Sequence, residues 1–491
     1  MTRKNEDEHR SSRPLRRVVI IGGGITGLSA AYRLQELARQ DHQPIEVRLL
    51  EASERLGGHL RTVDFHGCLL EKGPDSILAQ KPAARDLCRR LGINDEIVYP
   101  NNQGAGIRIL KGHRTLPLPE GFKMAAPTQW LSTLLSPLFS PRAKWQMLRE
   151  PFQPRRSDKD DESLGSFIRR RLGGEVLERV IQPILASIFL ADADALSLNM
   201  VMPQLALVEE KYGSVIKGFR EQARLQRGNS SAGPSFFSLK DGVSRLVSCL
   251  EQALPAGTVQ KQTRLRKLDF DRHSGRWNLT LKRRGVMQAD AVILACPFHA
   301  AVPVLKPHLP GLEKELRRTE YASCVTLNLV YQRSRVRRPM PGNGFFVPVP
   351  ERRSFMACNM VHVKFPDRVP DHLAVMRVFV GGATRPDLVA STDERLVQMV
   401  HDDLSELMGI DTPPWDVLVH RYNRAMPQFD VGYQQKLNRI ESQLQAQRGL
   451  YLAGGGMGSV GIPDCISCGE KIAERAIAEL AGADTCLEET G

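Results

Sequence analysis

The first clear hydrophobic pattern in the chain is a short β-branched run at residues 18–21, followed by three glycines at 22–24. Apolar positions then recur at helical spacing over residues 25–38, and a second apolar run covers residues 45–50. Short continuous apolar runs are typical of strands buried on both faces, whereas a 3.6-residue repeat indicates an amphipathic helix. The pattern therefore predicts a strand, a tight turn, a helix and a second, parallel strand.

The turn between the first strand and the helix is a candidate phosphate-binding loop, because Gly22, Gly24 and Gly27 fit the spacing G-x-G-x-x-G. The first glycine makes the turn, the second lets the backbone approach a pyrophosphate, and the third allows close packing of helix on strand. Free N–H groups and the dipole at the helix start favour the phosphates. The second strand ends at Glu51, where this arrangement places the acceptor for the adenosine ribose hydroxyls. The other interpretation of Glu51 is a solvated charge at a strand end.

Two more glycine-rich stretches extend this prediction. Gly57 and Gly58 continue the phosphate cradle, and the nearby Arg55 can neutralise a pyrophosphate. Towards the other end of the chain, a short strand at 451–453 precedes glycines 454, 455, 456, 458 and 461 and a helix predicted over 463–477. Glycine-rich backbone at a helix start predicts a second site for an anion or for ring oxygens.

The middle of the chain changes pattern twice. Strands are predicted at 264–271, 276–284 and 289–297. In residues 300–425, strands are predicted at 325–331, 345–349 and 374–380, and a helix at 393–408. Residues 124–212 lack strand alternation and predict helices at 130–139, 142–148, 163–172 and 175–189. Part of this helical stretch is both amphipathic and basic, with Trp130, Leu131, Leu134, Leu135, Leu138, Phe139 and Trp145 beside Arg142, Lys144, Arg149, Arg155 and Arg156. Such a face lies on an anionic bilayer or forms a helical lid, because both have this periodicity.

Composition narrows the class of protein. The chain has 491 residues, and its 42% hydrophobic content excludes disorder for the bulk. A formal charge of +13 favours anionic partners such as carboxylate-bearing substrates, phosphates or an acidic membrane surface. No apolar run is long enough to span a membrane, and the first 14 residues predict a solvated tail without the apolar segment of a signal peptide. Basic doublets are scattered and aromatic residues are few, so nucleic-acid binding is not expected.

The nine cysteines do not predict a disulfide framework, because they are odd in number and irregularly spaced. A reducing cytosol is therefore the expected setting. Cys465 and Cys468 form a C-x-x-C pair, which indicates a redox pair, half a zinc site or two structural thiols. No second ligand pair accompanies them, so we expect structural thiols and no metal.

Several segments together resemble one family. The arrangement around Gly22 to Gly58 resembles the flavin amine oxidases. The segments at 71–82 (EKGPDSILAQKP), 116–128, 209–214, 289–301, 425–433 and 460–466 look like the oxygen-dependent protoporphyrinogen and coproporphyrinogen III oxidases. This resemblance implies an α/β fold with a discontinuous Rossmann-like FAD-binding domain at 15–95, 236–300 and 425–480. It further implies an α+β substrate domain at 96–123, 213–235 and 301–424, a helical lid or membrane-facing subdomain at 124–212, and tails at 1–14 and 481–491.

The resemblance also implies the cofactor and its contacts. FAD is expected, and a metal is not. The residues expected to bind FAD are Gly22, Gly24, Ile25, Thr26, Gly27, Glu51, Arg55, Gly57, Gly58, Gly73, Pro74, Asp75, Ser76, Val259, Gly454, Val460, Gly461 and Ile462. Val259 takes the place where a backbone amide and carbonyl meet the adenine.

The reaction implied is the six-electron oxidation of a porphyrinogen to the porphyrin. Hydride leaves a methylene bridge for flavin N5, a pyrrole proton is lost, and O2 accepts the electrons and yields H2O2. No side chain is expected to act as a catalytic base. Arg108 is expected to bind a propionate, Phe346 and Phe379 to line the substrate cavity, and Ser187 to face the tetrapyrrole in place of a family glycine. Arg108 has an alternative as a solvated strand residue, and the two phenylalanines as plain sheet core.

Coproporphyrinogen III is the favoured substrate, because residues 118–128 look more like the oxidases of Gram-positive-type bacteria. Protoporphyrinogen IX is the main alternative. An amine oxidase, a carotenoid desaturase-like flavoenzyme and a non-catalytic porphyrin-binding flavoprotein also remain open. The expected partners are the porphyrinogen, O2 and the next enzyme of the haem pathway, in the cytoplasm or on the inner face of the cell membrane.

Overall fold

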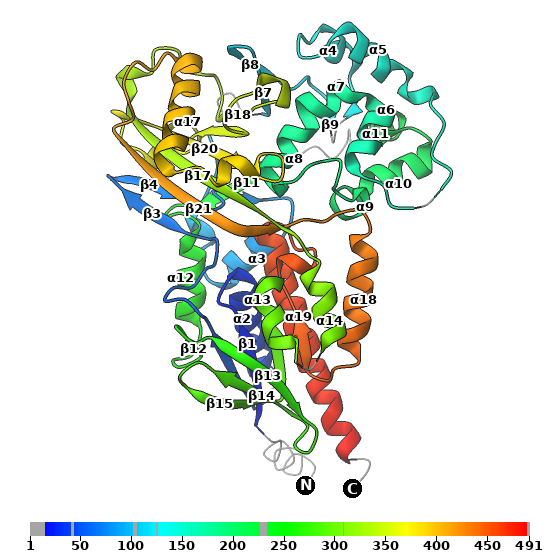
Figure 1. Cartoon of the computed structure of the whole chain (residues 1–491), viewed down its shortest axis with the longest axis vertical. Helices are drawn as coiled ribbons and strands as arrows, with labels where there is room; N and C mark the ends of the chain where they lie inside the picture. The colour runs from blue at the N-terminus through cyan, green and yellow to red at the C-terminus, as the bar shows by residue number, and fades with distance from the viewer. Residues whose placement is uncertain are drawn as a thin grey trace.

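The computed structural model describes residues 15–40, 44–101, 106–123, 126–158, 160–225, 233–307 and 309–488, so the tail predicted at 1–14 lies outside it. The molecule is elongated and has three regions (Figure 1). A domain built on a parallel sheet forms one end, and a domain built on a large sheet and a helical subdomain lie side by side at the other. No helix within these ranges is long and apolar enough to cross a membrane.

The parallel-sheet domain confirms the expected discontinuous Rossmann-like fold. Its five strands lie in the order β12-β2-β1-β16-β22, and all neighbours are parallel. They come from distant parts of the chain: β1 (Arg16–Ile21), β2 (Ile45–Leu50), β12 (Val259–Gln260), β16 (Ala291–Leu294) and β22 (Leu450–Leu452). Alternate residues of β1 face opposite layers, and Val18 and Val19 are both fully buried. The β-branched run is therefore an inner strand covered on both faces.

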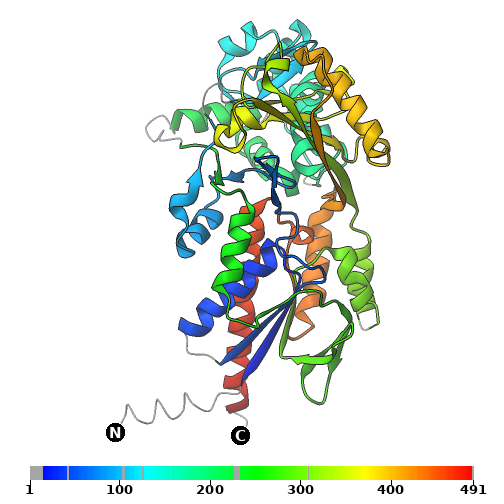
Figure 2. The same cartoon turned by 90° about the vertical axis from the view of Figure 1, so that its left-hand side faces the viewer.

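Helices cover one face of this sheet and a small meander covers the other (Figure 2). The helices are α2 (Ile25–Gln40), α3 (Ala83–Arg90), α12 (Ser244–Ala253) and α19 (Ile462–Glu488), which runs longer than predicted. The meander contains β13 (Leu265–Asp271), β14 (Arg276–Leu281) and β15 (Gly285–Ala289). The strand predicted at 289–297 is β16 of the parallel sheet, and its residues 291–294 are all buried. The third strand of the meander is β15, which is mostly exposed.

The large sheet has seven strands in the order β21-β17-β20-β19-β18-β7-β8. They are β21 (Asp416–Pro427), β17 (Tyr321–Gln332), β20 (Leu373–Gly381), β19 (Ala357–Met360), β18 (Gly344–Phe346), β7 (Arg108–Lys111) and β8 (Arg114–Pro117), and only β18 and β7 pair in parallel. One face packs beneath α17 (Asp393–Met408). The other face turns towards the helical subdomain and the parallel-sheet domain. A single row crosses this second face: Ile109, Phe346, Ala357, Phe379, Thr326 and His420.

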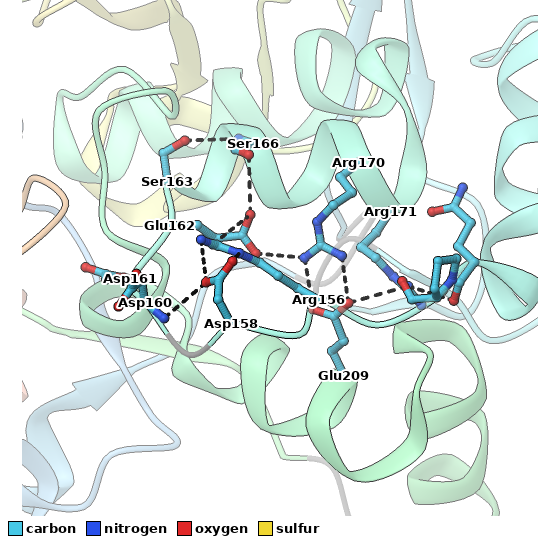
Figure 3. A network of polar contacts seen from close by, with 12 residues as sticks. Arg156, Asp158, Asp160, Asp161, Glu162, Ser163, Ser166, Arg170, Arg171 and Glu209 are labelled. Atoms are coloured by element: carbon cyan, nitrogen blue, oxygen red, sulfur yellow. Dashed lines mark hydrogen bonds and ion pairs between the residues drawn. The ribbon is translucent and has the colours of Figure 1, made fainter.

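The helical subdomain contains α4 (Trp130–Leu135), α5 (Pro141–Arg149), α6 (Leu164–Leu172), α7 (Gly174–Val176), the π-helix η3 (Leu177–Ile181), α8 (Gln182–Phe189), α9 (Leu198–Val201), α10 (Pro203–Tyr212) and α11 (Val215–Leu225). The helix predicted at 130–139 ends at Leu135, close before Pro137, which cannot continue a helix. Ion pairs tie the subdomain together (Figure 3). Arg170 binds both Glu162 and Glu209, and the fully buried Arg171 donates from Nε to Glu150 at 2.8 Å.

The remaining elements are distributed over the three regions. They include β3 (Thr62–Phe65), β4 (Cys68–Glu71), β5 (Ile77–Leu78), β6 (Ile97–Val98), β9 (Phe122–Lys123), β10 (Ala126–Pro127), β11 (Phe236–Leu239), α13 (Phe298–Leu305), α14 (Pro310–Arg317), α15 (Val361–Lys364), α16 (Pro386–Val389), α18 (Tyr433–Gln445) and the 3-10 turns η1 (Asn94–Glu96), η2 (Glu150–Phe152), η5 (Arg333–Arg335), η6 (Val349–Glu351), η7 (Pro366–Arg368) and η8 (Gly455–Met457). The hairpin of β3 and β4 lies beneath the large sheet and leads directly into the loop at 72–76 (Figure 1).

Candidate functional site

The glycine-rich turn between β1 and α2 gives each of its three glycines a different environment. Gly22 has a φ of +113°, which a residue with a side chain rarely adopts. A Cβ added at Gly24 would meet nothing within 4 Å, so its backbone borders open space. A Cβ at Gly27 would lie 2.0 Å from the carbonyl oxygen of Gly22, so the helix packs directly on the turn. This is the geometry of a backbone cradle for a pyrophosphate at a helix start.

Glu51 lies at the end of β2 and faces this turn. Its Oε2 accepts a 2.7 Å hydrogen bond from the amide of Gly23, and its Oε1 accepts one of 2.7 Å from the amide of Ser53. Two backbone donors fix the carboxylate, so Glu51 is not the freely solvated strand-end charge of the alternative interpretation. Val259 lies on the neighbouring strand β12, paired with Leu49 two residues before Glu51.

The second glycine pair lies against the first turn. Gly57 forms a parallel bridge with Gly24, and a Cβ at Gly58 would lie 3.4 Å from the Cα of Gly24. The guanidinium of Arg55 donates to the carbonyl oxygens of Leu56, at 2.9 Å, and Gly58. Burial and the nearby charge of Arg61 lower the pKa of Arg55. The positive charge is therefore held beside the glycines by backbone contacts alone.

Arg55 belongs to a group of cations that form no ion pair within the described ranges, although the charge of Glu51 acts on Arg55. Neither Arg55 nor Arg61 nor Lys72 forms an ion pair with any carboxylate in the part of the chain that the structure describes. Burial lowers the pKa of Lys72, and Arg61 and Arg55 act in the same direction. Burial and then the charge of Lys72 lower the pKa of His420, on β21, to about 4. A region with several positive charges that form no ion pair among the described residues attracts anions.

The loop at 72–76 brings the next four predicted residues to the same place. A Cβ at Gly73 would lie 1.8 Å from the carbonyl oxygen of His59, so only glycine fits between the two loops. Asp75 accepts two 2.9 Å hydrogen bonds from Nζ of Lys364 and lies 3.4 Å from Nη1 of Arg377. Burial alone would raise the pKa of Asp75, but these two cations outweigh it and hold the pKa far below its usual range. Pro74 and Ser76 flank this carboxylate.

The C-terminal glycine loop meets the first glycine turn from the other side. Gly454 has a φ of +101°, and a Cβ there would lie 3.7 Å from Oγ1 of Thr26, in the first turn of α2 beside Ile25. A Cβ at Gly469 would lie 2.3 Å from the carbonyl oxygen of Thr26, so α19 packs closely on α2. Val460 and Gly461 directly precede α19, which begins at Ile462. The structure thus brings together predicted residues from three distant parts of the sequence.

The C-x-x-C pair lies in this same helix start. Cys465 and Cys468 are both free and half-buried. The sulfur of Cys468 accepts a 3.4 Å hydrogen bond from the amide of Gly454, and that of Cys465 donates to the carbonyl oxygen of Ser459 at 3.6 Å. Their contacts are with the glycine loop, as expected of structural thiols.

The large sheet brings together two of the four predicted substrate residues. Phe346 and Phe379 lie in the same cross-strand row, separated only by Ala357, and both are half-buried. Phe379 packs against an apolar cluster that includes Ala186 of α8. Ser187 follows Ala186 and donates its hydroxyl hydrogen to the carbonyl oxygen of Ile184 at 2.8 Å. The C-terminal end of α8 therefore approaches the face on which both phenylalanines lie.

Arg108 does not join this group. Its neighbour Ile109 pairs with Phe346, so the alternation of side chains places Arg108 on the opposite face, with Leu110. Its Nε donates to Oγ1 of Thr115 at 3.1 Å, and its Nη2 donates to the Thr115 carbonyl oxygen at 2.8 Å. The expected grouping of Arg108 with the two phenylalanines is thus not found, because strand register determines the face.

Several residues of the site were missed by sequence reasoning. Lys72 lies inside the segment at 71–82, so the family resemblance of that segment could have pointed to it. His420, Lys364 and Arg377 lie on the large sheet or beside it, hundreds of positions from the loops they contact. No local motif marks them.

Comparison with known proteins places the chain among flavoproteins. Residues 25–477 match the family described as flavin containing amine oxidoreductase. The chain is 34% identical over 469 residues to coproporphyrinogen III oxidase of Bacillus subtilis (strain 168), covering 94% of this chain and 98% of that protein. It is 31% identical over 486 residues to protoporphyrinogen oxidase of Homo sapiens, covering 93% and 98%. A solved structure from Exiguobacterium sp. 255-15, assigned as a protoporphyrinogen oxidase, has a TM-score of 0.82 at 31% identity and covers 96% and 100% of the two chains.

Proposed function

The chain belongs to the flavin-containing amine oxidoreductase family and is an oxidoreductase, and we propose that it uses FAD and O2 to oxidise a porphyrinogen in haem synthesis. Coproporphyrinogen III is the substrate we favour, with coproporphyrin III and H2O2 as products. The observation that carries this proposal is the similarity to the Bacillus subtilis enzyme, which extends through all three regions of the fold. An aerobic fluorescence assay with two porphyrinogens tests it.

The choice between substrates rests on charge and on the relatives. Coproporphyrinogen III carries four propionates and protoporphyrinogen IX carries two. The excess of 68 basic over 55 acidic residues is compatible with the more anionic substrate, and the Bacillus subtilis relative is named for it. Protoporphyrinogen IX is the second candidate, because the human relative is named for it.

The residues at the glycine loops fit FAD. The open space at Gly24 leaves room for the pyrophosphate, and Arg55 supplies a nearby positive charge. Glu51 presents a fixed carboxylate for the ribose hydroxyls, beside the strand of Val259, where the adenine would bind. The loops at 73–76 and 454–462 would hold the ring end. When bound, FAD supplies the two-electron acceptor for hydride from a methylene bridge of the substrate.

The protein's own contribution to such a reaction is positioning. The row containing Phe346 and Phe379 offers an apolar surface on which a tetrapyrrole would lie, and α8 closes against it. Aromatisation of the product makes a strong base dispensable. The side chains would therefore orient the substrate and exclude water instead of moving protons.

We further propose that the helical subdomain contacts an acidic membrane surface. Leu131, Leu135 and Phe152 are 72%, 75% and 84% exposed, and Trp145 and Leu148 of the same subdomain are also exposed. Arg149 lies 4.5 Å above the Trp145 ring, and the exposed Arg142 adds charge. Leu138 and Phe139, by contrast, are buried in the core. Five exposed apolar side chains among cations form a surface complementary to anionic lipid.

A further inference from the structure

Arg377 is a buried arginine of the large sheet that reaches into the parallel-sheet domain. It lies on β20 and is only 1% exposed. Its Nη2 donates to the carbonyl oxygens of Gly73 and Lys72, the latter at 3.4 Å, and its Nη1 lies 3.4 Å from Oδ2 of Asp75. Thr326 of the adjacent strand also donates to the Lys72 carbonyl, at 3.1 Å. The large sheet thus holds the backbone of the loop at 72–75 from above.

The same guanidinium also contacts the predicted substrate surface. Its central carbon lies 4.8 Å above the ring of Phe379, two residues further along β20 and on the same face. A planar guanidinium can stack on an aromatic ring and still donate hydrogen bonds in its own plane. Arg377 therefore bridges Phe379 and the loop that begins at Lys72.

The remaining polar surroundings of Arg377 show that the loop is its main partner. Its Nε and Nη1 have no hydrogen-bond partner among the described residues. Asn328, directly opposite on β17, is fully buried, and its side-chain amide likewise finds no partner there. A buried charge destabilises the folded state unless other groups pair with it and accept its hydrogen bonds. The hydrogen bonds that Arg377 makes all go to the loop at 72–75.

We infer that Arg377 is a positioning residue, which fixes the loop at 72–75 against the flavin ring and couples that loop to Phe379. This inference rests on the proposed function, because it takes the loop as part of the FAD site. Lysine cannot replace Arg377, because a single ammonium cannot stack on the ring while holding two carbonyl oxygens and Asp75. The flavin environment should therefore respond to the shape of this side chain as well as to its charge.

Arg368 provides a matched control. It is also buried, comes from the large-sheet domain and reaches the parallel-sheet domain. Its Nη2 donates to Oγ of Ser238 at 2.8 Å and to the Leu239 carbonyl oxygen at 2.6 Å, and its Nη1 lies 3.5 Å from Glu71. Arg368 forms no hydrogen bond or ion pair with the loop at 72–75 among the described residues, and only the charge of Asp75 acts on it from that loop. Substitution of Arg368 reports the cost of weakening this interface alone.

The test compares FAD-loaded Arg377→Lys with Arg368→Lys. We measure visible circular dichroism and the flavin midpoint potential without substrate, and then KM and kcat with coproporphyrinogen III. Arg377→Lys should change the flavin spectrum and potential and raise KM at least about fivefold, whereas Arg368→Lys should keep the wild-type spectrum and stay within about twofold in KM. A wild-type spectrum and potential in Arg377→Lys would overturn the inference, as would an equal change in both variants.

A second variant keeps the test decisive if Arg377→Lys does not fold. Phe379→Leu removes the ring beneath the guanidinium, and it should shift the substrate-free flavin spectrum away from that of the wild-type protein. An unchanged spectrum in Phe379→Leu would contradict the coupling. If the wild-type protein oxidises no porphyrinogen while the spectral changes occur, the proposed function fails and the positioning role of Arg377 stands.

Discussion

The backbone amide of Gly23 donates a 2.7 Å hydrogen bond to Oε2 of Glu51, so the glycine turn after β1 is tied to the end of β2. This bond sets the carboxylate at one side of the turn, while Gly24 borders open space on the other. The amide of Ser53 donates to the second carboxylate oxygen, which leaves the side chain little freedom. A dinucleotide laid across the turn would meet the pyrophosphate cradle and the ribose acceptor in a fixed relationship.

Substitution of Gly24 by glutamate should abolish flavin binding without unfolding the protein. The new side chain would extend into the open space, where it would occupy the pyrophosphate position and repel its charge. Purified Gly24→Glu should be colourless, with an apo-protein melting temperature close to that of wild-type apo-protein. A yellow Gly24→Glu protein would contradict the assignment of this turn.

Substitution of Gly27 by alanine should reduce stability, although Gly27 lies only three residues after Gly24. Its Cβ would lie 2.0 Å from the Gly22 carbonyl oxygen, so α2 would have to move. We expect a loss of about 1–3 kcal/mol in the free energy of unfolding of the apo-protein, measured by denaturant titration. An apo-protein as stable as wild type would show that the helix does not pack as described.

Substitutions of Phe379 and of Arg108 should have different effects on KM in steady-state kinetics. Phe379→Ala removes an aromatic surface from the face towards α8 and should raise KM for the porphyrinogen about five- to tenfold. Arg108→Ala should leave KM within about twofold, because Thr115 holds the guanidinium on the opposite face. A large KM increase in Arg108→Ala would place that arginine in the substrate site after all.

Membrane contact should depend on the exposed face of the helical subdomain. We expect the wild-type protein to sediment with vesicles containing phosphatidylglycerol, less so at high salt, because exposed charges are screened. Leu135→Glu/Phe152→Glu should lose most of this binding. Val286→Glu, on the exposed β15 of the other domain, is the control and should bind like wild type. Equal binding by all three proteins would exclude this face as the contact.

Lys436 should make stability rise with pH in the alkaline range. It is buried, donates to Oγ1 of Thr319 at 2.5 Å, and lies 5.0 Å above the ring of Tyr433. Burial lowers the pKa of Lys436 to about 8, below its ordinary value of 10.5. Between these two values the unfolded chain binds the proton and the folded chain does not, so raising the pH favours the folded state.

The measurement for Lys436 is the difference in unfolding free energy between wild type and Lys436→Met. This difference should move in favour of wild type by on the order of 1–3 kcal/mol between pH 8 and 10.5. Taking the difference removes the contributions of other groups that titrate in this range. A difference that does not change with pH would show that Lys436 keeps its ordinary pKa.

Local signals were enough to predict several elements and the glycine turns. The helix at 393–408 has its predicted bounds, and local caps set them: Thr392 accepts from the amide of Arg395 at its start, and Gly409 ends it with a φ of +64°. Gly22, Gly24, Gly27 and Glu51 lie within one strand–helix–strand unit, so their relationship follows from chain geometry. Such features depend on neighbours in sequence.

The substrate side could not be predicted in the same way. Arg377 and Gly73 are 304 positions apart, and only the pairing of strands in the large sheet brings them together. The face on which Arg108 lies depends on the register between β7 and β18, which no local pattern reveals. Family resemblance supplied the expected roles of single residues, but their grouping follows from the sheet.

The central claim is tested most directly by porphyrin fluorescence. Purified yellow protein is mixed aerobically with coproporphyrinogen III or protoporphyrinogen IX, and the initial rates are compared with autoxidation in the presence of Gly24→Glu protein. We predict that fluorescence grows well above autoxidation with both substrates, faster with coproporphyrinogen III, and that H2O2 appears in proportion to the porphyrin. A faster rate with protoporphyrinogen IX would reverse the substrate assignment, and no growth above autoxidation with either would contradict porphyrinogen oxidation itself.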